Sequence, residues 1–189
     1  MALGDSLTAG YRLSKEQAFP ALLGKSLQAK GYAVEVVNAG VSGDTARQAL
    51  ARLDWTLKKA GPFQGALVEI GANDGLRRSS VDQMKENLEK IIVKLKSQGI
   101  EVFLIGMKLP MNWEKGYRDS FEATYRDLSK KHKIPLYPFL LEGLALNDRY
   151  NIEDRIHPNP EGHALIAGRL EKWLLGEPNF TQHASKVRP

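Results

Sequence analysis

The chain has 189 residues, of which 42% are hydrophobic and 26% charged, with a formal net charge of +5 and no cysteine. This composition fits one globular domain with a full core, and it excludes disulfides, thiolate metal sites and a catalytic thiol. A side-chain nucleophile must therefore be sought among serine and threonine. The basic residues are scattered and do not alternate with aromatic residues, so we expect a solvated basic surface and no nucleic-acid partner.

The beginning of the chain is short for a first strand. Only Met1, Ala2 and Leu3 precede Gly4, whereas a strand usually has about 5 to 6 residues. We therefore expect that the chain has been trimmed upstream. No signal peptide is recognisable, and the compartment is left open. Apolar runs fall well short of the roughly 18 residues that span a bilayer, so we expect no stable membrane insertion.

The hydrophobic pattern predicts alternating helices and strands. In chain order these are a helix at Glu16–Lys30, a strand at Ala33–Asn38, a helix from Asp44 or Thr45 to Gly61-Pro62, a strand at Gly65–Ile70, a helix from Val81 to Gly99, a strand at Ile100–Ile105, a helix through Tyr117–Leu128, a strand at Ile134–Phe139, and a helix that begins at Asn159 and Pro160. The alternation predicts an α/β fold with a parallel sheet covered by helices on both faces. We expect a single domain over residues 1–176 and a polar, flexible tail over residues 177–189.

Four short motifs follow predicted strands or precede the last helix. They are Gly4-Asp5-Ser6-Leu7, the stretch from Asn38 to Gly43, Gly71-Ala72-Asn73-Asp74, and Asp154-Arg155-Ile156-His157. Ligands of a parallel sheet bind beyond the carboxyl ends of its strands, so these motifs are expected to meet there. A serine hydroxyl needs a base that accepts its proton, and that base needs a third group to orient it. His157 and Asp154 can supply these two roles for Ser6.

The same four motifs, in this order, resemble the sequence blocks of the SGNH, or GDSL, hydrolases. Longer similarities to the bacterial thioesterase I, lysophospholipase and arylesterase group run through Leu7–Tyr11, Val41–Thr45, Asn73–Arg77, Pro138–Glu142 and Ile156–Asn159. The resemblance implies a three-layer α/β/α sandwich of flavodoxin-like type with five parallel strands. It also implies a serine esterase that hydrolyses small-molecule acyl esters and thioesters without a metal or organic cofactor. That group includes exported periplasmic enzymes.

The resemblance also implies which groups stabilise the oxyanion that forms when Ser6 attacks a carbonyl. It assigns this role to the backbone N–H groups of Ser6 and Gly43 and to the side-chain amide of Asn73. A glycine allows the backbone to come close to a ligand, which suits Gly43. Asp5 and Asp74 are expected to fix loops rather than to react.

The acyl pocket is predicted in the segment from Met107 to Tyr117, which follows a strand and is rich in apolar residues. By resemblance, Leu109 and Pro110 line the substrate groove. A loop that only covers the core is the alternative interpretation. An apolar groove would stabilise each buried substrate methylene by up to about 0.8 kcal/mol and so favour some chain lengths over others.

Simpler interpretations exist for individual residues. Ser6 alone could cap a helix, and Gly43 and Asn73 could be turn residues. Thr8 stands where a second glycine would complete a Gly-x-Ser-x-Gly elbow, which disfavours the α/β-hydrolase fold. His157 alone could be an ordinary loop residue, but it is the only histidine with an aspartate three residues earlier.

The other histidines, His132, His163 and His183, are interpreted as structural or solvated, and no metal site is predicted. Two other functions stay open at this point. One is a carbohydrate acetylesterase on the same fold, and the other is a catalytically silent module that binds acyl chains or nucleic acid. A monomer is compatible with the sequence, which does not fix the oligomeric state.

Overall fold

The computed structural model describes residues 1–184 of the chain, and these contain one five-stranded sheet. Its strands are Ala2–Gly4 (β1), Asn38–Gly40 (β2), Gly65–Glu69 (β3), Glu101–Ile105 (β4) and Leu136–Tyr137 (β5). The strand order is β2-β1-β3-β4-β5, and each neighbouring pair is parallel. The predicted α/β class with a five-stranded parallel sheet is confirmed.

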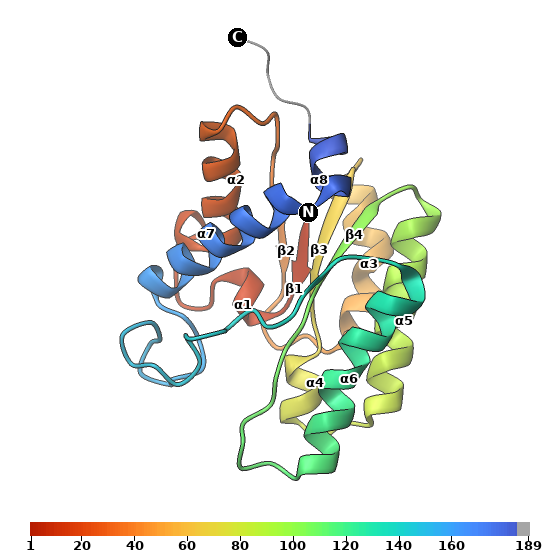
Figure 1. The fold of residues 1–189 in the computed structure, drawn as a ribbon, viewed down its shortest axis with the longest axis vertical. Helices are drawn as coiled ribbons and strands as arrows, with labels where there is room; N and C mark the ends of the chain where they lie inside the picture. Colours follow the sequence, from red (N-terminus) through yellow and green to blue (C-terminus); the bar gives the residue numbers. More distant parts are fainter. Residues whose placement is uncertain (185–189) are drawn as a thin grey trace.

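Helices cover both faces of this sheet (Figure 1). They are Ser6–Ala9 (α1), Phe19–Ala29 (α2), Ala46–Ala60 (α3), Ala72–Leu76 (α4), Val81–Ser97 (α5), Lys115–His132 (α6), Pro160–Gly176 (α7) and Pro178–His183 (α8), with a 3-10 turn at Lys15–Gln17 (η1). Helices α2 and α7 pack together on one face, while α3, α5 and α6 lie side by side on the other. The protein is therefore a three-layer α/β/α sandwich.

Local signals in the sequence determine where several helices begin. Thr45 caps α3 through a capping box with Gln48, and Asn159 caps α7 by accepting the N–H of Gly162 at 3.0 Å. These contacts pair N–H groups that have no partner within the helix. Helix α5 then buries an apolar stripe of Met84, Leu88, Ile91, Ile92 and Leu95. Burial of each such side chain contributes about 1.5–3 kcal/mol, which holds the helix on the sheet.

Two predicted strands differ from those in the structure. The strand predicted at residues 33–38 forms instead at β2, because the ladder needs a partner and β1 offers only Ala2–Gly4. The preceding valines, Val34, Val36 and Val37, pack against the core, and the carbonyl of Val37 accepts the N–H of Ala2 at 2.8 Å at the start of the ladder. The last strand is reduced to the two residues of β5, which pair with the end of β4.

Residues 178–183 of the predicted tail form a short helix, α8. Pro178 opens α8, and Phe180 packs against the core with its ring 6.1 Å from that of Phe103. Asn179 also donates to Glu101 at 3.3 Å. One aromatic residue in a polar stretch gives no periodic signal, so these contacts were not predictable from the pattern. Residues 185–189 of the expected tail lie outside the described residues.

Candidate active site

Ser6 stands at the carboxyl edge of the sheet, directly after β1. Asp5 caps α1 by accepting the N–H of Leu7 at 3.0 Å, which makes Ser6 the first residue of that short helix. Helix α1 packs closely on β2 because Gly40 has no side chain, and a Cβ there would overlap the amide nitrogen of Ala9. The absence of a side chain at Gly40 thus sets the position of the helix that carries Ser6.

His157 reaches Ser6 from the loop before α7. Its Nε2 atom lies 2.8 Å from the Ser6 hydroxyl oxygen, although the residues are 151 positions apart in the chain. Its Nδ1 atom lies 2.7 Å from a carboxylate oxygen of Asp154. The structure therefore brings together all three residues that the sequence singled out, in an unbroken hydrogen-bonded chain.

The Asp154 carboxylate is oriented by its own loop. Its other oxygen accepts the backbone N–H groups of Ile156 and His157, both at 2.9 Å. Partial burial acts to raise the pKa of Asp154, but the hydrogen bonds from His157 and Ile156 outweigh it, and the pKa lies below its usual value. The carboxylate is therefore ionised at neutral pH and holds the proton of the imidazole on Nδ1.

Tyr11 is part of this site, although no role was predicted for it. Its ring centroid lies 4.6 Å from that of His157, with the two rings tilted by 42°. Tyr11 follows the αL glycine that ends α1, so its place is set by the same turn that positions Ser6. An aromatic residue shortly after the serine motif was the only available signal.

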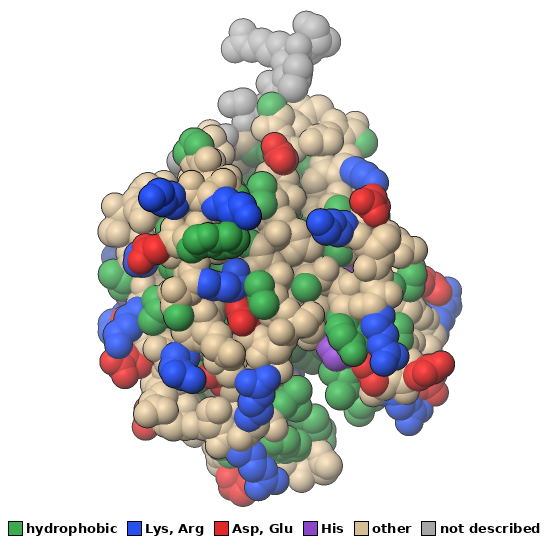
Figure 2. Space-filling view, turned by 180° about the vertical axis from the view of Figure 1, so that it is seen from behind, with side chains coloured by type: hydrophobic (Ala, Val, Ile, Leu, Met, Phe, Trp, Pro, Cys, Tyr) green, Lys and Arg blue, Asp and Glu red, His purple; other side chains and the backbone are tan. Residues whose placement is uncertain are grey.

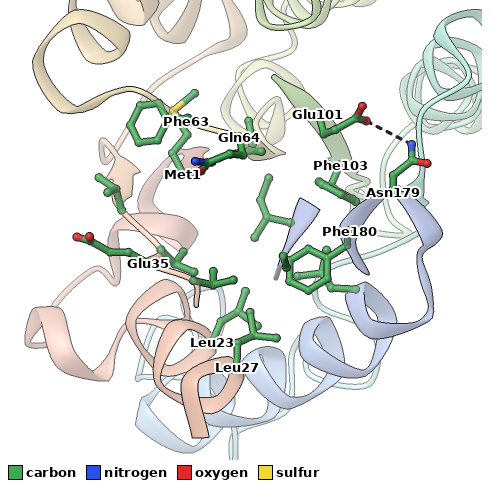
Figure 3. Close-up of a pocket in the computed structure, with 18 of the residues that line it drawn as sticks. Met1, Leu23, Leu27, Glu35, Phe63, Gln64, Glu101, Phe103, Asn179 and Phe180 are labelled. Carbon is green, nitrogen blue, oxygen red and sulfur yellow. Dashed lines mark hydrogen bonds between the residues drawn. The ribbon is translucent and has the colours of Figure 1, made fainter. Parts of the chain in front are cut away.

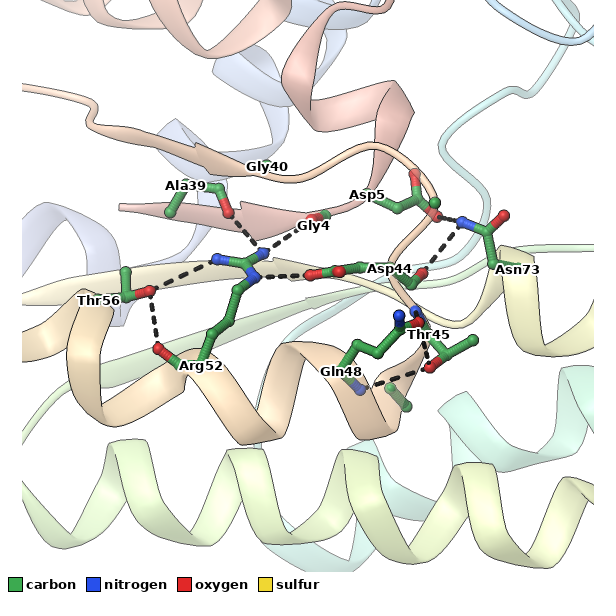
Figure 4. Close-up of polar contacts among 12 residues, drawn as sticks. Gly4, Asp5, Ala39, Gly40, Asp44, Thr45, Gln48, Arg52, Thr56 and Asn73 are labelled. Carbon is green, nitrogen blue, oxygen red and sulfur yellow. Dashed lines mark hydrogen bonds and ion pairs between the residues drawn. The ribbon is translucent and has the colours of Figure 1, made fainter.

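Gly43 and Asn73, which are expected to stabilise an oxyanion, follow the two strands that flank β1. Gly43 has a φ of +87°, a conformation that favours glycine, and its carbonyl accepts from Arg77 at 2.9 Å. Asn73 Nδ2 donates to the backbone oxygen of Asp44 at 3.0 Å and to a carboxylate oxygen of Asp5 at 3.2 Å (Figure 4). Both hydrogens of the Asn73 amide thus have acceptors. The hydrogen bond to Asp5 is the longer and therefore the weaker of the two.

Two buried carboxyl groups lie beneath the serine loop. Burial raises the pKa of Asp5 to about 6, and it raises the pKa of Glu69 well above its usual range, with the charge of Asp5 adding to the effect. Thr8 donates to Glu69 at 2.7 Å, while the other carboxyl oxygen of Glu69 has no partner among residues 1–184. Glu69 in a buried strand was a signal that the sequence reasoning missed.

Asp74 anchors the start of α3. Its carboxylate accepts the N–H of Ala46 at 2.8 Å, and burial raises its pKa above the usual value. Asp5 and Asp74 therefore both accept a backbone N–H at the start of a helix, Asp5 in α1 and Asp74 in α3.

The two residues predicted to line a substrate groove lie in different environments. Leu109 is buried beneath Gly75 of α4, where its side chain would overlap any added Cβ, and it belongs to the hydrophobic core. Pro110 is exposed, and the next residue, Met111, is 81% exposed. Leu109 therefore takes part in core packing, and Pro110 and Met111 carry the exposed apolar surface of the loop.

Hydrophobic side chains gather around the open side of the site. Figure 2 shows them on both sides of a notch at the lower end of the molecule, next to a histidine. Exposed apolar residues adjoin the site residues in the chain, namely Tyr11, Val41, Leu76 and Ile156. Apolar surface of this kind suits a substrate with an apolar acyl part.

Two of the other histidines have partners away from the chain of Ser6, His157 and Asp154. His163 is buried in α7, where its Nδ1 atom accepts the backbone N–H of Phe19 at 3.0 Å. His132 pairs with Glu89 at 2.7 Å. The side chain of His183 lies outside the described residues. Within the part of the chain that the structure describes, no group of three or more acidic or histidine side chains could hold a metal ion.

A cavity of about 550 Å³ lies at the opposite edge of the sheet, where the strands begin (Figure 3). Leu23, Phe103 and Phe180 point into it, and Met1 and Gly65 lie at its border. The backbone nitrogen of Met1 donates to the carbonyl of Gly65 at 2.8 Å. Because Ser6 lies at the carboxyl end of β1, this cavity is not part of its surroundings.

A parallel α/β/α sandwich with a Ser–His–Asp chain at the carboxyl edge of its sheet has the features of a serine hydrolase. Residues 2–165 match the model of the GDSL-like Lipase/Acylhydrolase family. The chain belongs to this family and is a carboxylic ester hydrolase. In residues 1–184 no helix is long and apolar enough to cross a membrane.

Similar proteins include the Thioesterase 1/protease 1/lysophospholipase L1 of Escherichia coli K12, which is 41% identical over 92% of this chain and 82% of its own length. The Arylesterase of Vibrio mimicus is 38% identical over 93% and 87% of the two chains. Among solved structures, TesA superposes with a TM-score of 0.86 at 34% identity, covering 94% of this chain and 97% of its own. The esterase EstA from Pseudoalteromonas sp., inhibited by monoethylphosphonate, gives a TM-score of 0.85 at 31% identity, with 92% and 97% covered.

Proposed function

We propose that Ser6, His157 and Asp154 form a catalytic triad that hydrolyses acyl esters and thioesters through an acyl-enzyme. The observation that carries the proposal is the hydrogen-bonded chain from the Ser6 hydroxyl to His157 at 2.8 Å and on to Asp154 at 2.7 Å. Both distances suit proton transfer and orientation of the base without rearrangement. The lowered pKa of Asp154 supports its role as the ionised partner of the imidazole.

The first half of the reaction forms the acyl-enzyme. The Ser6 oxygen attacks the substrate carbonyl carbon, and His157 Nε2 takes the hydroxyl proton, which leaves a tetrahedral oxyanion. The bond to the leaving oxygen or sulfur then breaks, and His157 returns the proton to that atom. In the second half, His157 deprotonates a water that attacks the acyl-Ser6 carbonyl. Collapse of this second intermediate releases the acid and restores the Ser6 hydroxyl.

The oxyanion is held by the N–H groups of Ser6 and Gly43 and by the amide of Asn73. Because Asn73 already donates to Asp44 and Asp5, donation to the oxyanion takes the place of the longer bond to Asp5, at 3.2 Å. Protonation of Asp5, whose pKa is raised to about 6, would make that exchange easier, since a neutral carboxyl is the weaker acceptor. The Asn73 amide thus joins the two backbone donors only when the oxyanion forms. The interaction therefore stabilises the transition state more than the bound substrate.

The substrate class follows from the relatives and from the surface around the site. The relatives are named thioesterase, lysophospholipase and arylesterase, which supports acyl esters and thioesters as substrates. The exposed side chains of Val41, Leu76 and Ile156 offer apolar contacts to an acyl chain. Each methylene buried there would contribute up to about 0.8 kcal/mol, so kcat/KM should rise with chain length until the apolar surface is covered.

The test compares matched esters and thioesters of increasing chain length with the wild type, Ser6→Ala and His157→Ala. Ser97→Ala serves as the control, because Ser97 is exposed on α5 and its hydroxyl donates to the carbonyl of Lys94 in its own helix. We expect both site variants to lose about 10⁴- to 10⁶-fold in kcat on all substrates, and the control to match the wild type. Equal activity of Ser6→Ala and Ser97→Ala would contradict the proposal.

A further inference from the structure

Arg52 of α3 reaches the carboxyl ends of two strands from behind the site. It belongs to none of the strand-end motifs. Its Nη2 atom donates to the carbonyl of Gly4 in β1 at 3.2 Å and to that of Ala39 in β2 at 2.8 Å. Its Nε atom pairs with the carboxylate of Asp44 at 2.6 Å. Figure 4 shows the guanidinium between these three groups.

The ion pair between Arg52 and Asp44 is largely shielded from water. The side chain of Arg52 is 20% exposed and that of Asp44 is 9% exposed. Removing one partner from such a pair leaves an uncompensated charge, so the interaction is costly to break. The planar fork of arginine can also serve several acceptors in fixed directions, which a lysine ammonium cannot. The contacts of Arg52 therefore need an arginine, and a positive charge alone does not replace it.

Two of the groups that Arg52 holds, in Gly4 and Asp44, lie close in the chain to a residue proposed to bind the oxyanion. Gly4 precedes Ser6 by two residues. Asp44 directly follows Gly43, and the backbone oxygen of Asp44 accepts the amide of Asn73 at 3.0 Å. Arg52 thus ties together the segments that carry all three proposed donors. Within residues 1–184, Arg52 makes its polar contacts with Gly4, Ala39, Asp44 and Thr56, and none of these lies in the loop of Asp154 and His157.

We propose that Arg52 is a positioning residue that sets the spacing of the oxyanion donors. This inference rests on the proposed function of Ser6, Gly43 and Asn73. Arg52 does not touch the substrate, and it leaves the proton transfer from Ser6 to His157 unchanged. Its loss misplaces donors that act mainly in the transition state, so it lowers kcat more than it raises KM.

The experiment compares Arg52→Lys and Arg52→Met with Arg47→Met, an exposed arginine on the same helix. Hydrolysis of p-nitrophenyl butyrate gives kcat, KM and their pH profiles. An alkyl trifluoromethyl ketone, which forms a tetrahedral adduct with an active serine, reports affinity for the transition-state shape, and the matching methyl ketone reports binding of the ground state. Thermal unfolding gives the folded fraction, to which all rates are normalised. If Arg52→Met does not fold, Arg52→Lys, which keeps a positive charge opposite Asp44, decides the test.

We expect both Arg52 variants to lose about 10- to 100-fold in kcat, with KM within about twofold, since small misplacements at a site can cost about 10² in rate. In the Arg52 variants, affinity for the fluorinated ketone should fall by the same factor, while methyl ketone binding and the acidic limb of the pH profile should stay as in the wild type. The control Arg47→Met should match the wild type in every measurement. The inference is overturned if Arg52→Lys keeps wild-type kcat and ketone affinity per folded molecule, or if only KM changes. Ser6→Ala is assayed in parallel to separate the role of Arg52 from the proposed catalytic function. Wild-type activity in Ser6→Ala would contradict the proposed function itself.

Discussion

We expect His163 to make the stability of the protein decrease in mild acid. Its ring is 1% exposed, and its Nδ1 atom accepts the N–H of Phe19, which ties the first turn of α7 to the start of α2. Burial, together with the charge of His157, lowers the pKa of His163 to about 4 from 6.5. Between these pH values the unfolded chain binds a proton that the folded protein does not. The stabilisation is therefore complete above pH 6.5 and is lost as the pH falls toward 4.

The size of the effect follows from the two pKa values. At about 1.4 kcal/mol for each tenfold difference in proton affinity, the fall from 6.5 to about 4 corresponds to about 3 kcal/mol. The buried carboxyl groups of Asp5 and Glu69 act in the opposite direction, because their raised pKa values favour the folded state as the pH falls. The contribution of His163 must therefore be measured as a difference between variants.

The assay is urea unfolding of the wild type and His163→Asn between pH 8 and pH 4. Asparagine keeps an acceptor near the position of Nδ1 but does not titrate. Its smaller side chain lowers the stability of the variant at pH 8. The difference in free energy of unfolding between the wild type and His163→Asn should then shrink by about 3 kcal/mol as the pH falls to 4. Ser97→Ala is the control, and its difference in stability from the wild type should stay constant over this pH range, because Ser97 is exposed and does not titrate. Parallel pH curves for the wild type and His163→Asn would refute the reasoning.

Three further substitutions test the site and its support. Asp154→Asn should lower kcat by about 10⁴, because the imidazole loses the carboxylate that fixes its tautomer. Steady-state ester hydrolysis measures this change, and a loss below tenfold would argue against the proposed role of Asp154. Asn73→Ala should lower kcat by about 10² to 10³ in the same assay with KM little changed, and an equal rise in KM would point to substrate binding instead. Gly40→Ala should destabilise the protein by about 1–3 kcal/mol in chemical unfolding, because its methyl group meets the backbone of α1. Gly168→Ala, which has open space around it in α7, should not destabilise, and equal effects of the two would contradict the packing account.

Elements with strong local signals were predictable from the sequence. The start of α3 at Thr45 and of α7 at Asn159 follows from capping residues, and the stripe of α5 follows from its periodicity. The site residues Ser6 and His157 were predictable because each stands in a short motif at a predicted strand end or before the last helix. Capping residues, periodicity and short motifs can all be recognised from residues that are close together in the sequence.

Features that depend on distant partners were not predictable. The position of β2 depends on which residues β1 offers for pairing, and the packing of Phe180 depends on a gap beside Phe103. Arg52 looks in the sequence like any arginine on an amphipathic helix. Its contacts with Gly4 and Ala39 exist only once two strands have been placed side by side.

The most direct test of the account is the site of covalent modification by a fluorophosphonate. The reagent is added in stoichiometric amount, residual esterase activity is recorded, and the adduct is located by peptide mass spectrometry. If Ser6 is the nucleophile, we expect one adduct per chain, on Ser6, with activity lost in proportion to labelling and no labelling of Ser6→Ala. An adduct on another residue that accompanies the loss of activity, or equal labelling of Ser6→Ala, would contradict it.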